Sequence, residues 1–472
     1  MRRLVSKDFR DLVLKTYPNL ANNKVYWELM KLLMFGLEEA NTGYKIINYR
    51  RLALVELGYR DSYIRCFHKN YTAINLLKEF QQKVMTSETF NWSDYSYVNH
   101  KARVAITEFT DEIQQALQKQ INDTLNRDYN VKNLVYFVNG NKYNSKIEKQ
   151  QRDKLKEEVD MINNRLATEE QLPLLNYLNN LPILSFSKVI NEDNKYLAAL
   201  EIAKIEDKVK REFQINLLAS IVEDPKPLYQ PSIKGNTVRI FPYNPSILML
   251  KKQVRKTLCK GWIEFDLASS QLAIVAETWQ IQSIKDYLTS GNKIWLDLVN
   301  TLNIEYNDDN KKVLKEALYS IIFGKTKKNL VLLIQSHFGT NGARLWLTHP
   351  IISTLLTARD NKINQITKQG KLTTIFNKEV LIVGKTKADK AACIRSALAQ
   401  EAQAVEFYLM QPILDLALTT TDFVMTAFQH DGASIKFTDI TKQDSWINRI
   451  CTSVKQRADS LNIPTQLEIE YL

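Results

Sequence analysis

The sequence predicts an α+β fold, and three features carry this prediction. Up to about residue 218, apolar residues recur every three or four positions, which is the spacing of amphipathic helices. Beyond that point short strand-like runs alternate with longer helix-like ones. The 472 residues include only 13 glycines and 11 prolines, which is typical of a helix-rich chain with short connections. We therefore expect a helical N-terminal part followed by a mixed catalytic part.

Charge and composition narrow the class of partner. Lysine and arginine number 64 against 52 aspartates and glutamates, and the resulting charge of +12 favours polyanions. Nucleic acid is the first expectation, and an anionic membrane surface the second. No apolar run is long enough to span a bilayer and no leader-like segment follows Met1, so a cytoplasmic protein without a membrane partner is expected. The four cysteines are far apart, which predicts neither disulfides nor a zinc site: Cys66, Cys259, Cys393 and Cys451.

The N-terminal part contains no chemical motif, and we divide it into regions by its pattern of apolar and charged residues. Residues 1–104 read as helical without an assignable role, with a clear amphipathic segment at 23–37. A second helical region, 105–223, begins with a segment at 105–125. The charged stretch 142–165 is compatible with a basic helix pair that follows nucleic acid, although a solvated helix face is the commoner explanation. Prolines then cluster between residues 224 and 245, where we place a boundary, so that 224–472 forms the mixed part.

Two aspartates in the mixed part are the candidates for chemistry. A strand-like run, 261–266, ends on Asp266 and leads into a helix-like segment, and a later pair of strand-like runs is joined through Gln429-His430-Asp431-Gly432. Transfer of a phosphoryl group requires acidic residues that converge on divalent metals. Each aspartate alone also has a structural explanation, since Asp266 can cap a helix and Asp431 can occupy a hairpin turn.

The order and spacing of three segments resemble the family A DNA polymerases. The first segment, DLASSQLAIVA at 266–276, resembles their motif A, written D-Y-S-Q-I-E-L-R-x-x-A. The resemblance implies that Asp266 and the adjacent Leu267 belong to the metal-binding site. It places Gln271 where the family has a glutamate that packs against the sugar and excludes a 2′-hydroxyl.

The second segment, 311–324, resembles motif B, written R-x3-K-x3-(F/Y)-x3-Y-G. Steps of four return to one face of a helix, so Lys311, Lys315, Tyr319 and Phe323 are expected on a single stripe. The resemblance implies that the lysines bind the triphosphate, the tyrosine contacts the sugar, and the phenylalanine stacks beside the templating base. An ordinary amphipathic helix ended by Gly324 would explain the aromatic residues, but not the two lysines.

The third segment, 428–432, resembles motif C, written Q-V-H-D-E. It implies that Asp431 is the second metal ligand and that His430 lies near the primer 3′ end. Arg395 and Gln403 reproduce the R-x7-Q spacing of the helix that follows the primer–template duplex, and Arg239 loosely matches a minor-groove arginine. A basic group ahead of motif A is expected to contact phosphates: Lys251, Lys252, Arg255, Lys256 and Lys260.

Taken together, the resemblance implies a right-hand polymerase architecture, with palm and fingers in 224–472 and a thumb-like region in 105–223. It implies a DNA polymerase that extends a primer from deoxynucleoside triphosphates with two Mg²⁺ ions, Mn²⁺ being an alternative, and that works with replication accessory proteins. No D-x-E strand motif precedes Asp224, so proofreading is expected to be absent. Five positions depart from the family pattern, as in divergent plasmid or phage enzymes: Gln271, Lys311, Phe323, Ala399 and Gly432.

Two other functions are compatible with parts of this pattern. A single-subunit RNA polymerase or primase-like enzyme shares the His-Asp motif, but the bulk of Gln271 argues against it because those enzymes have glycine there. A DNA-binding replication protein that has lost catalysis is the second alternative. The presence of both Asp266 and Asp431 argues against that one.

Overall fold

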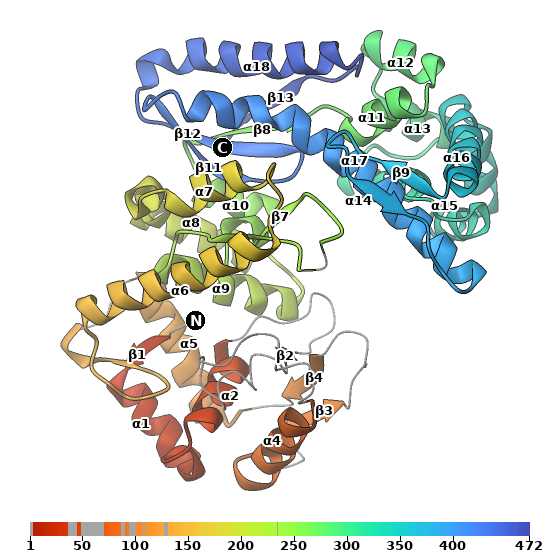
Figure 1. Ribbon diagram of the computed structural model, residues 1–472. Coiled ribbons are helices and arrows are strands. Elements are labelled where there is room, and N and C mark those ends of the chain that lie inside the picture. The colour runs from red at the N-terminus through yellow and green to blue at the C-terminus, as the bar shows by residue number, and fades with distance from the viewer. Residues whose placement is uncertain are drawn as a thin grey trace. The chain divides into compact units, whose positions relative to one another are not determined.

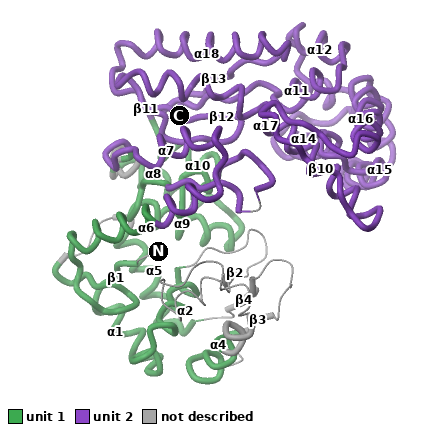
Figure 2. Tube along the Cα trace, in the orientation of Figure 1, with its two compact units in different colours: residues 1–157, 186–227, 244–260 green, residues 158–185, 228–243, 261–472 purple. Residues whose placement is uncertain are grey.

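A computed structural model describes residues 3–35, 45–48, 70–85, 90–93, 101–106, 109–126, 131–233 and 235–472. It confirms the α+β class and divides into two compact units (Figures 1 and 2). Unit 1 comprises residues 1–157, 186–227 and 244–260, and unit 2 comprises 158–185, 228–243 and 261–472. The chain therefore enters and leaves unit 2 within the proline-rich segment. Cys66 lies outside the described residues, and no helix among them is long and apolar enough to cross a membrane.

Unit 1 is mainly helical. Two of its expected helices are present, as α2 and as α5, which starts several residues later than the pattern indicated. Its short strands pair antiparallel as β1-β5 and as β2-β4-β3. The elements are β1 (Leu4–Ser6), α1 (Lys7–Thr16), α2 (Lys24–Phe35), β2 (Lys45–Asn48), α4 (Asn70–Lys83), β3 (Phe90–Ser93), β4 (Lys101–Ile106), α5 (Asp111–Asn126), β5 (Leu134–Tyr136), α8 (Glu192–Ala203), α9 (Lys208–Glu223) and α10 (Lys252–Leu258).

The charged stretch 142–165 forms one helix, α6 (Ser145–Leu166), rather than a pair. Only Val159 and Asn163 of this helix are buried, so most of its charges lie on a solvated face, as the commoner explanation predicted. Residue 157 is the last that α6 contributes to unit 1.

Unit 2 combines a four-stranded sheet and two short two-stranded pairs, β6-β7 and β9-β10, with a group of helices (Figure 1). Its elements after α6 are α7 (Leu172–Asn180), β6 (Tyr229–Pro231), β7 (Ile240–Pro242), β8 (Ile263–Leu267), α11 (Ser270–Thr278), α12 (Gln282–Thr289), α13 (Ile294–Leu302), α14 (Asp308–Ile322), α15 (Lys327–Thr348), α16 (Pro350–Gln369), β9 (Lys371–Thr373), β10 (Glu379–Leu381), α17 (Lys387–Ala417), β11 (Phe423–Phe428), β12 (Gly432–Phe437), α18 (Gln443–Ser460) and β13 (Leu467–Tyr471).

The sheet of unit 2 is antiparallel, in the order β11-β12-β8-β13, and contains the three strands that the sequence indicated. Residues alternate between its two faces. Ile263, Phe265 and Leu267 of β8 are buried on one face, whereas Glu264 and Asp266 share the other. Helices α17 and α18 pack against each other and against strands of this sheet, as Figure 1 shows. The face that bears Asp266 carries polar side chains, including the buried Glu264.

Helices α11 to α16 surround a second apolar core, in which Trp346 is fully buried. Helix α14 starts after Asn307, whose side chain accepts a hydrogen bond from the Asn310 amide, and it ends before Gly324, which has φ +76°. Its core side is apolar, through Leu314, Leu318 and neighbours. This face fixes the rotation of the helix, so the residues of the expected stripe lie at its less buried edge.

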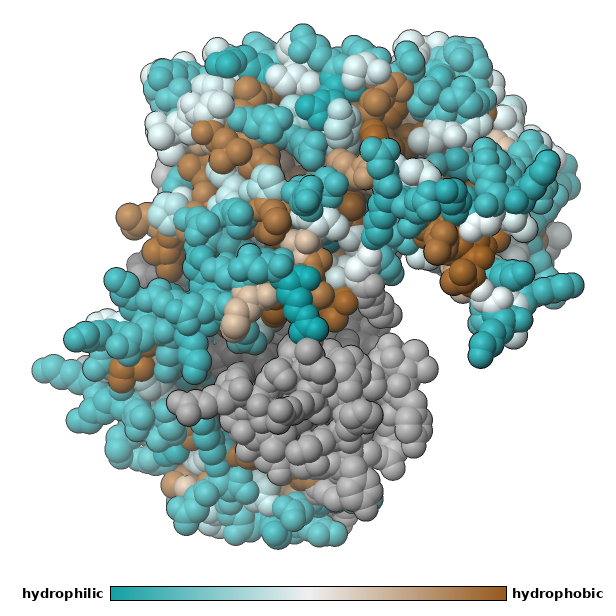
Figure 3. Space-filling model, in the orientation of Figure 1, coloured by the Kyte–Doolittle hydropathy of each residue, from teal (hydrophilic) through white to brown (hydrophobic). Residues whose placement is uncertain are grey.

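The hairpin β6–β7 is held by two asparagine side chains. The Nδ2 atoms of Asn163 and Asn179 donate to the carbonyl of Tyr229 at 3.1 and 2.9 Å, and Asn179 Oδ1 accepts from the Tyr229 amide at 2.7 Å. All three residues are buried, so these bonds replace the ones that water would make. On the face of the molecule shown in Figure 3, the side chains are hydrophilic over most of unit 2, with apolar residues gathered in a few patches.

Candidate functional site

The register of two strands brings Asp266 and Asp431 together. Asp266 lies opposite Gly432 in the pairing of β8 with β12, and the Leu267 amide donates to the Asp431 carbonyl at 2.9 Å. Both aspartates are half-buried. Two carboxylates separated by 165 positions in the chain therefore occupy neighbouring positions at one end of the sheet.

Asp431 is presented by a strained turn. His430 has φ +72°, and the Asp431 amide donates to the Gln429 carbonyl at 2.9 Å, which is the hydrogen-bond pattern of a γ-turn. The Gln429 amide in turn donates to the Gly432 carbonyl at 2.7 Å. A non-glycine residue in this conformation costs free energy and persists only where the surroundings enforce it. The tight turn therefore places Asp431 directly before β12, at the end of the sheet where Asp266 lies.

Gly432 leaves the space that Asp266 uses. A Cβ atom built on Gly432 would collide with Oδ1 of Asp266 and would lie 3.1 Å from its carboxyl carbon and 3.0 Å from the Phe265 carbonyl oxygen. The carboxylate thus lies where a side chain of residue 432 would be. Motif C has an acidic residue where this chain has Gly432, and the carboxylate of Asp266 occupies the space that such a side chain would need.

A third carboxylate, Glu406, lies in the same cluster and was missed by the sequence prediction. Its Oε2 accepts from Nη2 of Arg239 at 2.6 Å, and its Oε1 accepts from Nε2 of Gln271 at 2.6 Å and from Ser270 Oγ at 3.3 Å. Ser270 Oγ also lies 3.5 Å from Oδ2 of Asp431. Burial raises the pKa of Glu406, and Asp431 raises it further, whereas Arg239 and Gln271 act in the opposite direction.

A weak signal for Glu406 exists in the sequence. It stands three residues after Gln403, about one helical turn away, and interrupts a largely apolar run of α17. A charged residue inside such a run is seldom buried unless it is paired.

The stripe on α14 is formed as the spacing predicted. Lys315 Nζ lies 5.3 Å from the centre of the Tyr319 ring, and the rings of Tyr319 and Phe323 are 6.5 Å apart. Lys311 lies further along the helix, with its Nζ 6.0 Å from the Tyr306 ring. The stripe therefore runs as two cations followed by two aromatic rings.

Tyr319 connects this stripe to the carboxylates. Burial raises the pKa of its phenol, and the negative charges of Asp431 and Glu406 raise it further, so the hydroxyl stays protonated at neutral pH. Within the part of the chain that the structure describes, this hydroxyl has no hydrogen-bond partner. It is a donor that a ligand can use.

Three of the residues expected at the primer strand meet beside Asp431. Thr237 links two of them, because its hydroxyl donates to Gln403 Oε1 at 2.6 Å and accepts from the Arg239 amide at 3.0 Å. The Phe241 ring lies edge-on to His430 at 5.5 Å. Burial, with a smaller effect of the Arg239 charge, lowers the pKa of His430 to about 4, so the imidazole is neutral at physiological pH.

Arg395 and a basic group were also expected to contact nucleic acid. Arg395 is exposed, two helical turns before Gln403, and its Cγ would lie 3.2 Å from a Cβ built on Gly324, so α17 meets the end of α14 there. The basic group Lys251, Lys252, Arg255, Lys256 and Lys260 lies in unit 1, on α10 and at its ends.

The donor set suits a hard divalent cation. Mg²⁺ prefers carboxylate oxygens and keeps several waters, so it needs few protein ligands, and Asp266 and Asp431 supply two on adjacent strands. Among the described residues, no group of three or more His, Cys, Asp or Glu side chains is arranged to hold a metal ion. The third carboxylate, Glu406, is already engaged by Arg239 and Gln271.

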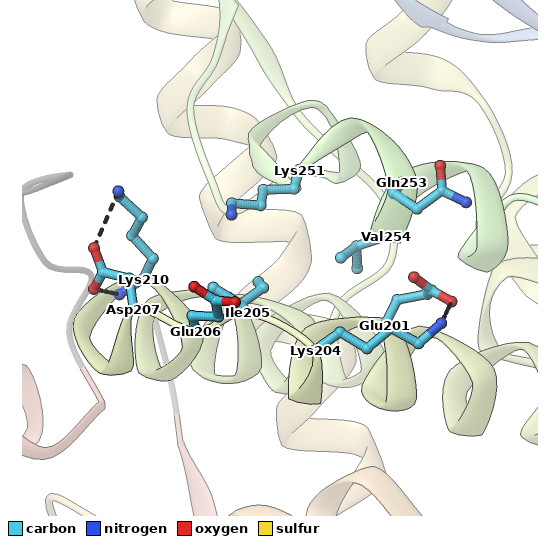
Figure 4. A pocket seen from close by; sticks show the side chains of 9 residues that line it. All are labelled: Glu201, Lys204, Ile205, Glu206, Asp207, Lys210, Lys251, Gln253 and Val254. Atoms are coloured by element: carbon cyan, nitrogen blue, oxygen red, sulfur yellow. Dashed lines mark hydrogen bonds and ion pairs between the residues drawn. The ribbon is translucent and has the colours of Figure 1, made fainter. Parts of the chain in front are cut away.

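A surface hollow of about 470 Å³ lies elsewhere, in unit 1 (Figure 4). Two of its lysines are paired with acidic neighbours, Lys204 Nζ with Glu201 at 2.6 Å and Lys210 Nζ with Asp207 at 3.0 Å. Its charges therefore largely compensate one another. None of the candidate catalytic residues lines it.

Comparison with known proteins gives little beyond this geometry. No protein-family model matches the chain, and no curated protein does. A solved structure that it resembles is the polymerase domain of Pol1 from M. smegmatis in complex with DNA primer–template and dNTP, at 12% sequence identity and a TM-score of 0.43. The match covers 68% of this chain and 65% of that one. With a likeness this partial, function has to be inferred from the residues of the site.

Proposed function

We propose that this chain is a template-directed DNA polymerase of right-hand architecture that extends a primer from deoxynucleoside triphosphates. The observation that carries the proposal is the pairing of β8 with β12, which sets Asp266 beside the turn that presents Asp431. Asp431 does lie in the hairpin turn that its sequence context allowed, whereas Asp266 does not cap the helix that follows it. The cap position before α11 is occupied by Ser269, and Asp431 lies in one cluster with Ser270, Glu406 and Tyr319.

Each group of side chains has a role in this proposal. Asp266 and Asp431, with the adjacent Leu267, would hold divalent cations, which when bound supply charge neutralisation at the reacting phosphate. Lys311 and Lys315 bind the triphosphate electrostatically. Further along α14, Tyr319 contacts the sugar together with Gln271, and Phe323 stacks beside the templating base. The primer strand is oriented by Arg239, His430, Gln403 and Arg395.

The deciding experiment is primer extension by the purified full-length chain with Mg²⁺ and the four deoxynucleoside triphosphates. We expect extension that stops at the template end and ceases when EDTA is added. A parallel reaction with ribonucleotides separates a DNA polymerase from an RNA polymerase or primase-like enzyme. DNA binding without extension under any of these conditions would refute the proposal in favour of a non-catalytic replication protein.

Tyr319→Phe tests the stripe on α14. The free phenolic hydroxyl can replace a hydrogen bond that is lost with the 3′-hydroxyl of a chain terminator, and an unpaired buried polar group costs about 1–3 kcal/mol. We expect the wild-type chain to incorporate dideoxynucleotides readily, and Tyr319→Phe to discriminate against them by roughly ten- to a hundredfold more. Competitive incorporation of dideoxy- and deoxynucleotides measures this ratio.

Tyr306→Phe is the matched control, because Tyr306 is an exposed tyrosine whose ring lies 6.0 Å from Lys311 Nζ. It should leave the ratio unchanged. Equal ratios for Tyr319→Phe and the wild type would show that Tyr319 is only a packing residue.

Gln271→Ala tests sugar selection. Gln271 is buried on the first turn of α11, and removing its side chain opens space beside the sugar position. We expect the preference for deoxy- over ribonucleotides to fall by roughly ten- to a hundredfold, measured as the ratio of the two kcat/KM values. Gln400→Ala removes another buried amide, whose Nε2 bonds only within α17 to Ser396 at 3.1 Å, and should not change this ratio. An unchanged ratio in Gln271→Ala would show that another residue selects the sugar.

A further inference from the structure

Glu406 is buried more deeply than any other charged group of the cluster. Its side chain is 1% exposed, and it is held by one cation and two neutral donors. A carboxylate that is shielded from solvent is stable only when it is paired and hydrogen-bonded. Removing one partner of a buried ion pair destabilises the protein by more than the intact pair stabilises it. The contacts of Glu406 are therefore a constraint on Arg239 and Gln271 as much as on Glu406 itself.

The charge on Glu406 fixes which end of the Gln271 amide faces it. The ion pair with Arg239 at 2.6 Å favours the ionised carboxylate, which only accepts hydrogen bonds. The Gln271 atom at 2.6 Å must then be the NH₂ group. The amide oxygen, Oε1, is left on the other side, where it is buried and has no partner among the described residues.

Arg239 is fixed in a similar way. Its Nη2 is taken by Glu406, and its Nε is buried without a partner in the described part of the chain. Among the described residues, Gln271 therefore keeps an unpaired acceptor and Arg239 an unpaired donor. Both belong to side chains that Glu406 orients, and unpaired buried atoms of this kind are unfavourable unless a ligand satisfies them.

We propose that Glu406 is a positioning residue for nucleotide selection, which couples the sugar-contacting Gln271 to the primer-contacting Arg239. This inference rests on the proposed polymerase function. It explains why this chain can have Gln271 where motif A has a glutamate. The buried carboxylate comes from Glu406 on α17 instead of from residue 271 on α11. Glu406 touches neither nucleotide nor metal in this scheme. It sets which atoms of Gln271 and Arg239 remain available to the substrate.

A swap of the two residues tests the coupling. Gln271→Glu places two carboxylates against each other, and Glu406→Gln leaves Arg239 without its counter-charge. We expect either change alone to lower kcat/KM for deoxynucleotides by roughly ten- to a hundredfold and to weaken sugar discrimination. The double variant, Gln271→Glu with Glu406→Gln, keeps one carboxylate and one amide in contact. It should recover activity to within several-fold of the wild type, with a coupling of about tenfold or more.

Glu401→Gln is the matched control. Glu401 also lies buried on α17 and pairs with Lys362 Nζ at 2.7 Å, so its loss lowers stability without touching Gln271 or Arg239. We expect a lower Tm with an unchanged deoxy-to-ribo ratio. If the two single effects simply multiply in the double variant, or if Glu406→Gln behaves like Glu401→Gln, the inference fails while the polymerase function stands. If the wild-type chain extends no primer, the proposed function fails and this inference with it.

Discussion

Asp266→Asn and Asp431→Asn should each reduce Mg²⁺-dependent primer extension by roughly a thousandfold or more. Each removes one of the two carboxylates that the β8–β12 pairing sets side by side, and stabilisation by metal ions contributes several kcal/mol to such reactions. An amide is nearly the same size as a carboxylate, so the fold should remain and Tm should change little. Single-turnover extension on a saturating primer–template measures the effect.

The control for this pair is Asp444→Asn, which neutralises an exposed carboxylate in the first turn of α18. It should retain wild-type activity. DNA binding should persist in both active-site variants, because removing a negative charge does not weaken attraction to phosphates. Full activity in either Asp266→Asn or Asp431→Asn would exclude the mechanism proposed here.

Gly432→Ala should lower the extension rate by about a hundredfold. The added Cβ would occupy the space of the Asp266 carboxylate, which must then rotate away from Asp431. A displacement of about 1 Å at a reacting centre is enough for an effect of this size. The backbone of Gly432 does not have a positive φ, so alanine adds no φ strain, and its Cβ would lie 3.0 Å from the Phe265 carbonyl oxygen. The extension rate should be measured over a range of Mg²⁺ concentrations. We expect a weaker apparent affinity for Mg²⁺ together with a lower maximum rate.

Gly291→Ala offers the opposite combination. Gly291 has φ +77° and nothing within 4 Å of an added Cβ, so alanine strains the backbone there without displacing any side chain. We expect a lower Tm and an unchanged extension rate. If Gly432→Ala loses stability but keeps its rate, Asp266 is not held in a position that matters for catalysis.

Some helices and strands of unit 2 could be predicted from the sequence, because side chains of one kind recur in each at the spacing of a helix or a strand. Strands β11 and β12 were recognised from β-branched and aromatic runs on either side of a turn, and helix α14 from steps of four. The convergence of Asp266 with Asp431 could only be expected through resemblance, because strand register over 165 positions leaves no local trace.

Glu406 shows why the rest could not be predicted. Its partners, Arg239 and Gln271, are 167 and 135 positions away, and nothing in the spacing of the three residues indicates that they meet. The same holds for Asn163 and Asn179, which are polar residues on otherwise ordinary helices until the backbone of Tyr229 is placed between them. Side-chain to main-chain bonds across long separations depend on the packing of whole elements, and sequence periodicity does not report that packing.

The hydrogen bonds from Asn163 and Asn179 to the backbone of Tyr229 affect where this protein can be truncated. A truncated chain that starts in the proline-rich segment would keep every residue assigned to catalysis but would lack Asn163 and Asn179, which anchor the hairpin that carries Arg239. Recombinant pieces intended to retain unit 2 should therefore begin before α6, whose last residues belong to that unit. The boundary that matters for expression lies well upstream of the first recognisable motif.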